Sequence, residues 1–359
     1  MRTLIFATLF AATTLALAGA SVSASKTGAQ GGGSLLQSDA SDAAQPSQTP
    51  PATTTRTPSS ASAQDADEQE RVTIRLVRLP ITVLDKKEQP VSGLTASDFV
   101  ILEDKKPQQI ESFIDERERL PIFVGVLMDT SSSTAGKLKF EQEAAMNFIH
   151  TVIRLRKDKV AFVTFDHEVK LLQDFTDKLD LLDRAVYSVK KPGTQTALYD
   201  AIWQFCDEKF RSLGAARRVL VVITDGDDTY SRARLQDAID LAQRTETVVF
   251  AISTKSGFSG TVPGVEAGTV KDAGDRDLVK LCEKTGGKAF FSGDFLELER
   301  SFTKIAKELR SQYLITYKPT NNVYDGKFRK IEVKLAQGRG DGLKVRARDG
   351  YTALSDTVR

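Results

Sequence analysis

Three short polar segments of this chain carry oxygen donors next to strongly apolar runs. Asp129, Ser131 and Ser133 directly follow one apolar run, and Asp225 follows another. Thr196 lies between them, in a glycine-containing segment that leads into a predicted helix. Carboxylate and hydroxyl oxygens are hard ligands, which suit Mg²⁺, Mn²⁺ or Ca²⁺ and not zinc or copper. The residue types therefore predict a site for a hard divalent cation.

The placement of these donors supports that prediction. In open α/β sheets, ligands bind at the carboxyl ends of the strands, near the point where the strand order reverses. A site with few directly bound carboxylates leaves a cation under-neutralised, so an external anion can complete its coordination. The alternative is that the Ser and Asp side chains only cap helices at strand ends. All three segments fall on suitable elements, which favours the cation site.

The elements that position these donors alternate between strands and helices over residues 118–311. Continuous apolar runs predict strands that are buried on both faces, and helical spacing of apolar residues predicts the helices between them. The predicted strands are residues 122–128, 160–165, 219–224, 248–252 and 289–291. The predicted helices are residues 138–153, 179–186, 197–210, 235–244, 277–284 and 296–309. This order predicts an α/β fold with a doubly wound, mostly parallel sheet.

The flanking segments, residues 71–117 and 312–359, show the alternation that is typical of short antiparallel strands. Glycines over residues 338–342 predict a hairpin whose return strand is residues 345–351. Each segment is too small to fold alone. We therefore expect the two flanks to pair into one small antiparallel β-sandwich, with the α/β domain inserted between them.

At the polar segments the sequence resembles the von Willebrand factor type A (VWFA) domain with its metal-ion-dependent adhesion site. The family motif is Asp-x-Ser-x-Ser, a distant Thr and a distant Asp, which Asp129, Ser131, Ser133, Thr196 and Asp225 match. The resemblance covers about residues 120–310, and the flanks resemble the bacterial, acidobacterial-type VWFA-related proteins. It implies that Ser131, Ser133 and Thr196 ligate the cation by hydroxyl, while Asp129 and Asp225 act largely through water. It also implies an open position for a Glu or Asp of a partner protein.

The N-terminal part predicts export. Residues 1–24 have a positive start, an apolar stretch and small residues before a cleavage site, as in a secretory signal peptide. Residues 25–70 are rich in Ser, Thr, Pro and Gly and predict a disordered linker. No later segment is long and apolar enough to cross a bilayer. We expect a protein of the periplasm or the extracellular space, with no membrane span after signal cleavage.

Composition and net charge further restrict the classes of function that the sequence allows. The 359 residues carry a formal net charge of +2, which argues against a nucleic-acid-binding protein. We expect no enzyme but a protein-binding or adhesion module that captures an acidic residue of a partner through Mg²⁺, or through Mn²⁺ or Ca²⁺. One alternative is a structural or assembly module with a vestigial metal site. The other is phosphoryl transfer at Asp129, which is disfavoured because Ser131 stands where such sites have a second Asp.

Several residues outside this set have simpler interpretations. Cys206 and Cys282 lie on apolar faces of different predicted helices, which favours two free thiols over a disulfide. Trp203 is expected in the core. The long loop over residues 257–274 is typical of either a binding element or a disordered segment. The sequence leaves open the partner, the native cation and the oligomeric state.

Overall fold

The structure, a computed structural model, describes residues 76–115, 120–154, 156–190, 192–255, 273–291, 295–338, 340 and 342–354. The predicted signal peptide and linker lie outside these residues, as does nearly all of the predicted loop over residues 257–274. In the part of the chain that is described, no helix is both long enough and apolar enough to span a membrane.

Apolar runs build a six-stranded central sheet in the order β10-β9-β8-β5-β6-β7. Its strands are β5 (Ile122–Asp129), β6 (Lys159–Phe165), β7 (Val169–Thr176), β8 (Arg217–Thr224), β9 (Thr247–Ser253) and β10 (Ala289–Phe291). All neighbouring strands are parallel except β7, which pairs antiparallel with β6 at one edge. The chain moves outward from β5 to β6 and β7 and then returns to place β8 on the other side of β5. The strand order therefore reverses between β5 and β8.

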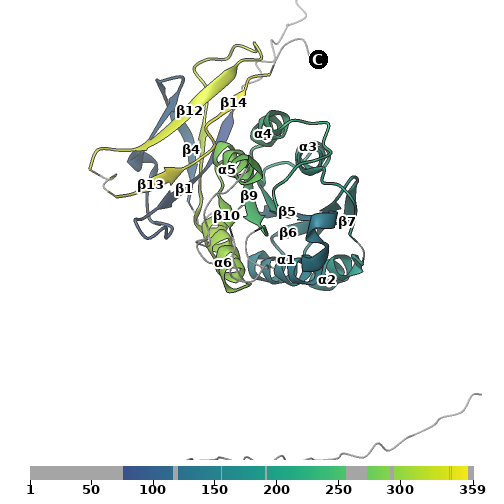
Figure 1. Ribbon diagram of the computed structural model, residues 1–359. Helices are drawn as coiled ribbons and strands as arrows, with labels where there is room; N and C mark the ends of the chain where they lie inside the picture. The colour runs from purple at the N-terminus through teal and green to yellow at the C-terminus, as the bar shows by residue number, and fades with distance from the viewer. Residues whose placement is uncertain are drawn as a thin grey trace, which may run out of the picture. The chain divides into compact units, whose positions relative to one another are not determined.

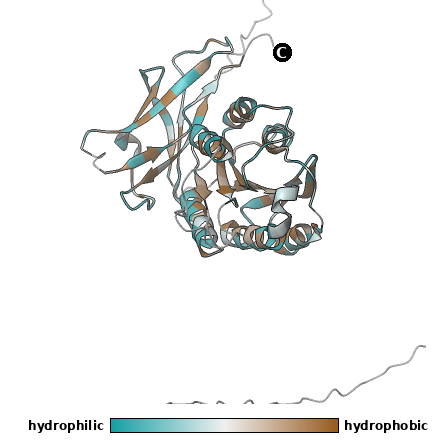
Figure 2. Cartoon of the chain, viewed as in Figure 1, coloured by the Kyte–Doolittle hydropathy of each residue, from teal (hydrophilic) through white to brown (hydrophobic). Residues whose placement is uncertain are grey.

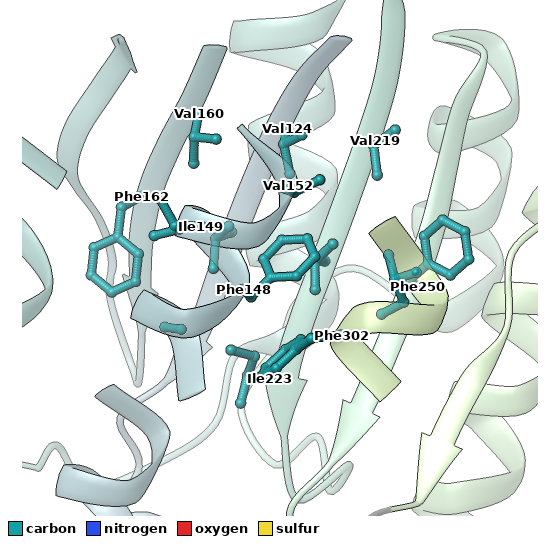
Figure 3. Packing of buried hydrophobic residues seen from close by; sticks show 14 of the residues in the cluster. Val124, Phe148, Ile149, Val152, Val160, Phe162, Val219, Ile223, Phe250 and Phe302 are labelled. Atoms are coloured by element: carbon teal, nitrogen blue, oxygen red, sulfur yellow. The ribbon is translucent and has the colours of Figure 1, made fainter. Parts of the chain in front are cut away.

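Helices cover both faces of this sheet (Figure 1). In chain order they are η2 (Ser132–Lys137), α1 (Leu138–Val152), α2 (Leu179–Ser188), α3 (Leu198–Phe205), η3 (Cys206–Phe210), α4 (Leu235–Arg244), α5 (Ala273–Thr285) and α6 (Phe295–Ser311). One core lies under α1, α2 and α6 and the other under α3, α4 and α5. In the first core, Phe148 of α1 and Phe302 of α6 pack with ring centroids 5.2 Å apart, over the apolar side chains of the strands (Figure 3).

The flanks of the α/β domain form two four-stranded antiparallel sheets, β13-β1-β11-β4 and β14-β12-β2-β3. Their elements are β1 (Val77–Leu84), η1 (Ala96–Asp98), β2 (Phe99–Glu103), β3 (Lys106–Gln108), β4 (Ile110–Ile114), β11 (Tyr313–Tyr317), β12 (Phe328–Leu335), β13 (Lys344–Arg346) and β14 (Gly350–Thr352). β1 from before the α/β domain pairs with β11 from after it, and β2 pairs with β12 in the same way. Both sheets contribute to one apolar core, which includes Leu79, Ile101 and Tyr313. The predicted fold class, an α/β sheet inserted in a β-sandwich, is confirmed.

The predicted C-terminal hairpin is correct only in part. β13 does not return along β12 but pairs with β1 in the other sheet, while β14 pairs with β12. The segment between β13 and β14 is held mainly by contacts with the α/β domain. The buried guanidinium of Arg348 donates hydrogen bonds to the carbonyl oxygens of Gln243 on α4 and Arg78 on β1. Asp349 accepts hydrogen bonds from the Gln243 amide at 2.8 Å and from Lys284. These contacts draw the chain toward the helices and divide the return strand between the two sheets.

Two further expectations about single elements differ from the structure. Strand β7 was not predicted, because its side chains, including Leu171 and Leu172, are largely exposed and show no apolar alternation. Trp203 is not in the core, since 40% of its surface is exposed on α3. Colouring by hydropathy shows the mixture of polar and apolar residues on these outer elements (Figure 2). Cys206 and Cys282 are both free and buried.

Candidate metal centre

The two predicted acidic residues lie next to each other where the strand order reverses. Asp129 is the last residue of β5, and Asp225 directly follows β8. Met128 pairs with Ile223, so the two strands end at the same level of the sheet. The Thr224 hydroxyl donates a hydrogen bond to Oδ2 of Asp129 at 2.6 Å. The parallel sheet thus brings together carboxylates that are far apart in the sequence, at the edge where ligands of such sheets bind.

The loop after β5 folds back on Asp129. The backbone N–H of Ser131 donates to Oδ1 of Asp129 at 2.8 Å, and the Thr134 hydroxyl donates to the Ser131 carbonyl at 3.0 Å. This tight turn places the hydroxyl oxygens of Ser131 and Ser133 3.0 Å apart. Neighbouring ligands of an octahedral Mg²⁺ with bond lengths of about 2.1 Å are separated by about 3 Å. The two hydroxyl groups are hydrogen-bonded to each other, and their spacing is also that of adjacent ligands.

The glycine loop that carries Thr196 lies against the same strand ends. The N–H of Gly193 donates to the carbonyl of Thr130, and the Ser132 hydroxyl donates to the carbonyl of Thr194 at 3.2 Å. Thr196 itself is buried, and its carbonyl accepts hydrogen bonds from the N–H groups of the loop after Asp225. The loop is thus held between the ends of β5 and β8. The structure places all five predicted residues in three segments that contact one another at one edge of the sheet.

We expect Gly193→Ala to displace this loop. An added Cβ would overlap the carboxylate of Asp166, which follows β6. The loop must shift to relieve this overlap, and Thr196 must move with it. We expect cation affinity to fall by about tenfold and stability by about 1–3 kcal/mol, as measured by calorimetry and urea unfolding. Gly214→Ala is the matched control, because nothing lies within 4 Å of its Cβ position. Equal cation affinity in the two variants would contradict the assigned role of the loop.

The electrostatics of the site favour a bound cation. Asp129 is fully buried, and burial raises its pKa to about 6, against the hydrogen bonds from Thr224 and Ser131. Repulsion from Asp225 adds to this rise. Oδ1 of Asp225 is buried and has no hydrogen-bond partner among the described residues. Buried polar atoms are normally satisfied, and an exception indicates a water or an ion at that position.

The donors fit a hard cation. No cluster of three His, Cys, Asp or Glu side chains that could hold a metal occurs within the described ranges. A cation at this edge would therefore bind mainly to the hydroxyl groups of Ser131, Ser133 and Thr196 and to water. Mg²⁺ keeps several waters in protein sites and accepts this mixture, whereas zinc sites are built mainly from Cys and His ligands.

A third buried acidic residue lies near these donors and was missed in the sequence. Glu141 of α1 is fully buried, and its pKa is affected by the charges of both Asp129 and Asp225. It lies three residues after Leu138 and four before Ala145, which places it on the apolar face of the helix. A charged residue in an apolar stripe is the signal that could have identified it.

Comparison with known proteins agrees with this geometry. The family model of the von Willebrand factor type A domain matches residues 124–304, which is half of the chain. No curated protein matches the chain significantly. The match begins within β5 and ends within α6, so it includes every segment of the candidate site.

Solved structures with a similar fold come from several sources. An aerotolerance-related membrane protein from Bacteroides fragilis is 16% identical, with 52% of this chain and 98% of that chain covered and a TM-score of 0.41. The PilB minor pilin from Streptococcus sanguinis is 15% identical, with 54% and 62% covered and a TM-score of 0.40. Proximal thread matrix protein 1 from the mussel byssus is 16% identical, with 58% and 51% covered and a TM-score of 0.44. On the match of the family model to half of its length, this chain belongs to the von Willebrand factor type A domain family.

Proposed function

We propose that this protein is an exported, non-catalytic binding module that captures a Glu or Asp side chain of a partner protein through a divalent cation. The observation that carries the proposal is the pair of Ser131 and Ser133 hydroxyl groups, 3.0 Å apart, beside the buried carboxylate of Asp129. Ser131, Ser133 and Thr196 would hold the ion, and Asp129 and Asp225 would accept hydrogen bonds from its waters. When bound, the cation supplies a positive charge that attracts an external carboxylate.

Three observations support binding over catalysis. The predicted ligands are mainly neutral hydroxyl groups, which leave much of the charge of the cation uncompensated. Ser133 is exposed, so an incoming side chain can approach from that side. The position two residues after Asp129 holds Ser131, so the second carboxylate of the phosphoryl-transfer alternative is missing.

The first test is calorimetric titration of the protein with MgCl₂ and MnCl₂. We expect Asp129→Asn to lower cation affinity by about 100-fold, because it removes a buried negative charge beside the ion while keeping the shape of the side chain. Asp180→Asn is the control, because Asp180 is an exposed carboxylate that pairs with Arg184 on α2. Equal binding heats for the wild type and Asp129→Asn would overturn the cation site.

The second test separates binding from a vestigial site. Envelope proteins of the source organism are captured on the immobilised protein with MgCl₂ or with EDTA. Under the proposal, partner capture is lost with EDTA and in Asp129→Asn. Cation binding together with EDTA-insensitive capture would instead favour a structural module.

A further inference from the structure

The third acidic group near the candidate metal centre is connected to it through one threonine. Thr254, directly after β9, donates a hydrogen bond from its hydroxyl to Oε1 of Glu141 at 3.0 Å. Its N–H donates to the carbonyl of Thr224 at 2.9 Å, and the hydroxyl of Thr224 is bonded to Asp129. Glu141 is thus joined to Asp129 through Thr254, which follows β9, and Thr224, which ends β8. The first turn of α1 is held at the same edge as the ends of β5 and β8.

The second carboxylate oxygen of Glu141 has no such partner. Oε2 is buried and accepts no hydrogen bond from any described residue, as is also true of Oδ1 of Asp225. Two unsatisfied carboxylate oxygens in one buried cluster are costly, because each has lost its water without replacement. The chain itself leaves them unsatisfied, so an external donor or ion accounts for them better than packing does.

The charged groups around Glu141 also favour a bound cation. The charged groups with the largest effect on the pKa of Glu141 are Asp129, Lys137 and Asp225, and the Lys137 ammonium donates to the Thr254 carbonyl at 2.5 Å. Two carboxyl groups thus disfavour a negative charge on Glu141, and one ammonium group favours it. A divalent cation at this edge would offset the repulsion among the acidic groups.

We propose that Glu141 is a third acidic group of the metal centre, which accepts a hydrogen bond from a cation-bound water through its free Oε2. This inference rests on the proposed function, because it requires the cation. It assigns Glu141 a positioning role that sets cation affinity, beyond the donors of the family motif. Thr254 and Lys137 hold the carboxylate in place.

The test compares two substitutions on the same helix. Glu141→Gln keeps the size of the side chain and removes the buried carboxyl group, and Glu143→Gln removes an exposed carboxyl group two residues away. For each variant, Mg²⁺ affinity is measured by calorimetry, and the melting temperature is measured in EDTA. We expect Glu141→Gln to raise the melting temperature without metal and to weaken Mg²⁺ binding by about 10–100-fold. Glu143→Gln should leave Mg²⁺ affinity within about twofold of wild type.

The outcomes distinguish this inference from the proposed function. Wild type that binds no Mg²⁺ overturns the proposed function. Wild-type protein that binds Mg²⁺ while Glu141→Gln binds it equally well overturns only the role of Glu141, which would then be a buried acid without contact to the ion. A lower melting temperature of Glu141→Gln in EDTA would also contradict the inference, because a buried carboxyl group with an unsatisfied oxygen should destabilise the metal-free state relative to the amide.

Discussion

Without metal, the wild-type protein loses on the order of 5 kcal/mol of unfolding free energy relative to Glu141→Gln between about pH 4.5 and pH 8. Burial raises the pKa of Glu141 to about 8, from 4.5 for an ordinary Glu, and repulsion from Asp129 and Asp225 adds to this rise. The folded state therefore holds its proton where the unfolded state has released it. For an acid shifted upward, stability is fully present below the unfolded pKa and is lost as pH rises through the folded pKa.

The measurement is urea unfolding in EDTA across this pH range for the wild type and Glu141→Gln. The variant has no carboxyl at this position, so its stability should fall less with pH, and the two profiles should diverge toward pH 8. Asp129 has a pKa raised to about 6 and contributes in the same direction in both proteins. The difference between the profiles therefore reports the Glu141 carboxyl together with its interaction with Asp129. Parallel profiles would show that the Glu141 carboxyl is solvated in the metal-free state.

Replacing Arg348 by Met should destabilise the protein by about 3 kcal/mol. The buried guanidinium donates to carbonyl oxygens of Gln243 and Arg78, and methionine removes both of these hydrogen bonds. The Gln243 oxygen then keeps only backbone N–H donors such as that of Glu246. Methionine fills much of the same volume, so the loss reports the hydrogen bonds and not a cavity. Because the two carbonyls belong to the α/β domain and to the sandwich, both parts should lose stability together.

Urea unfolding at neutral pH measures this effect. Lys344→Met is the control, since Lys344 is an exposed cation on β13, four residues before Arg348. We expect the control to stay within about 0.5 kcal/mol of wild type. If the two variants are equally stable, the Arg348 hydrogen bonds contribute nothing to holding the return segment.

Most of the α/β sheet could be predicted from local sequence because its strands are buried on both faces. A strand such as β8 is apolar along nearly its whole length, so its pattern does not depend on knowing its neighbours. The edge strand β7 could not be found this way, because it exposes Leu171 and Leu172 and depends on pairing with β6. The pairing of the predicted return strand, residues 345–351, could not be predicted for a related reason. Glycines predict a turn, but pairing of the segment after it is decided by Arg348, whose acceptors are distant in sequence.

The candidate site also combines residues that local sequence predicts with a residue that depends on distant contacts. Asp129 and Asp225 could be placed together because parallel strands end at a common edge. The apolar stripe of α1 marks Glu141 as a buried acid, but its link to Asp129 could not be predicted. That link depends on Thr254, 113 positions along the chain, and on the absence of a donor for Oε2 among the described residues. A local pattern can identify polar residues at the end of a predicted strand. It cannot identify a role that depends on a buried oxygen for which the folded chain supplies no hydrogen-bond donor.

The sandwich also has a mechanical consequence. Ile114 of β4 pairs with Leu314 of β11, so the chain leaves for the α/β domain and returns from it at neighbouring positions. Tension applied upstream of β1 and downstream of β14 would pass through the hydrogen bonds that join the two flanks, and would bypass the covalent path through the inserted domain. The paired flanks would therefore carry the applied force. As long as β1 and β4 stay paired with β11, tension on the chain would not reach the loops around Asp129.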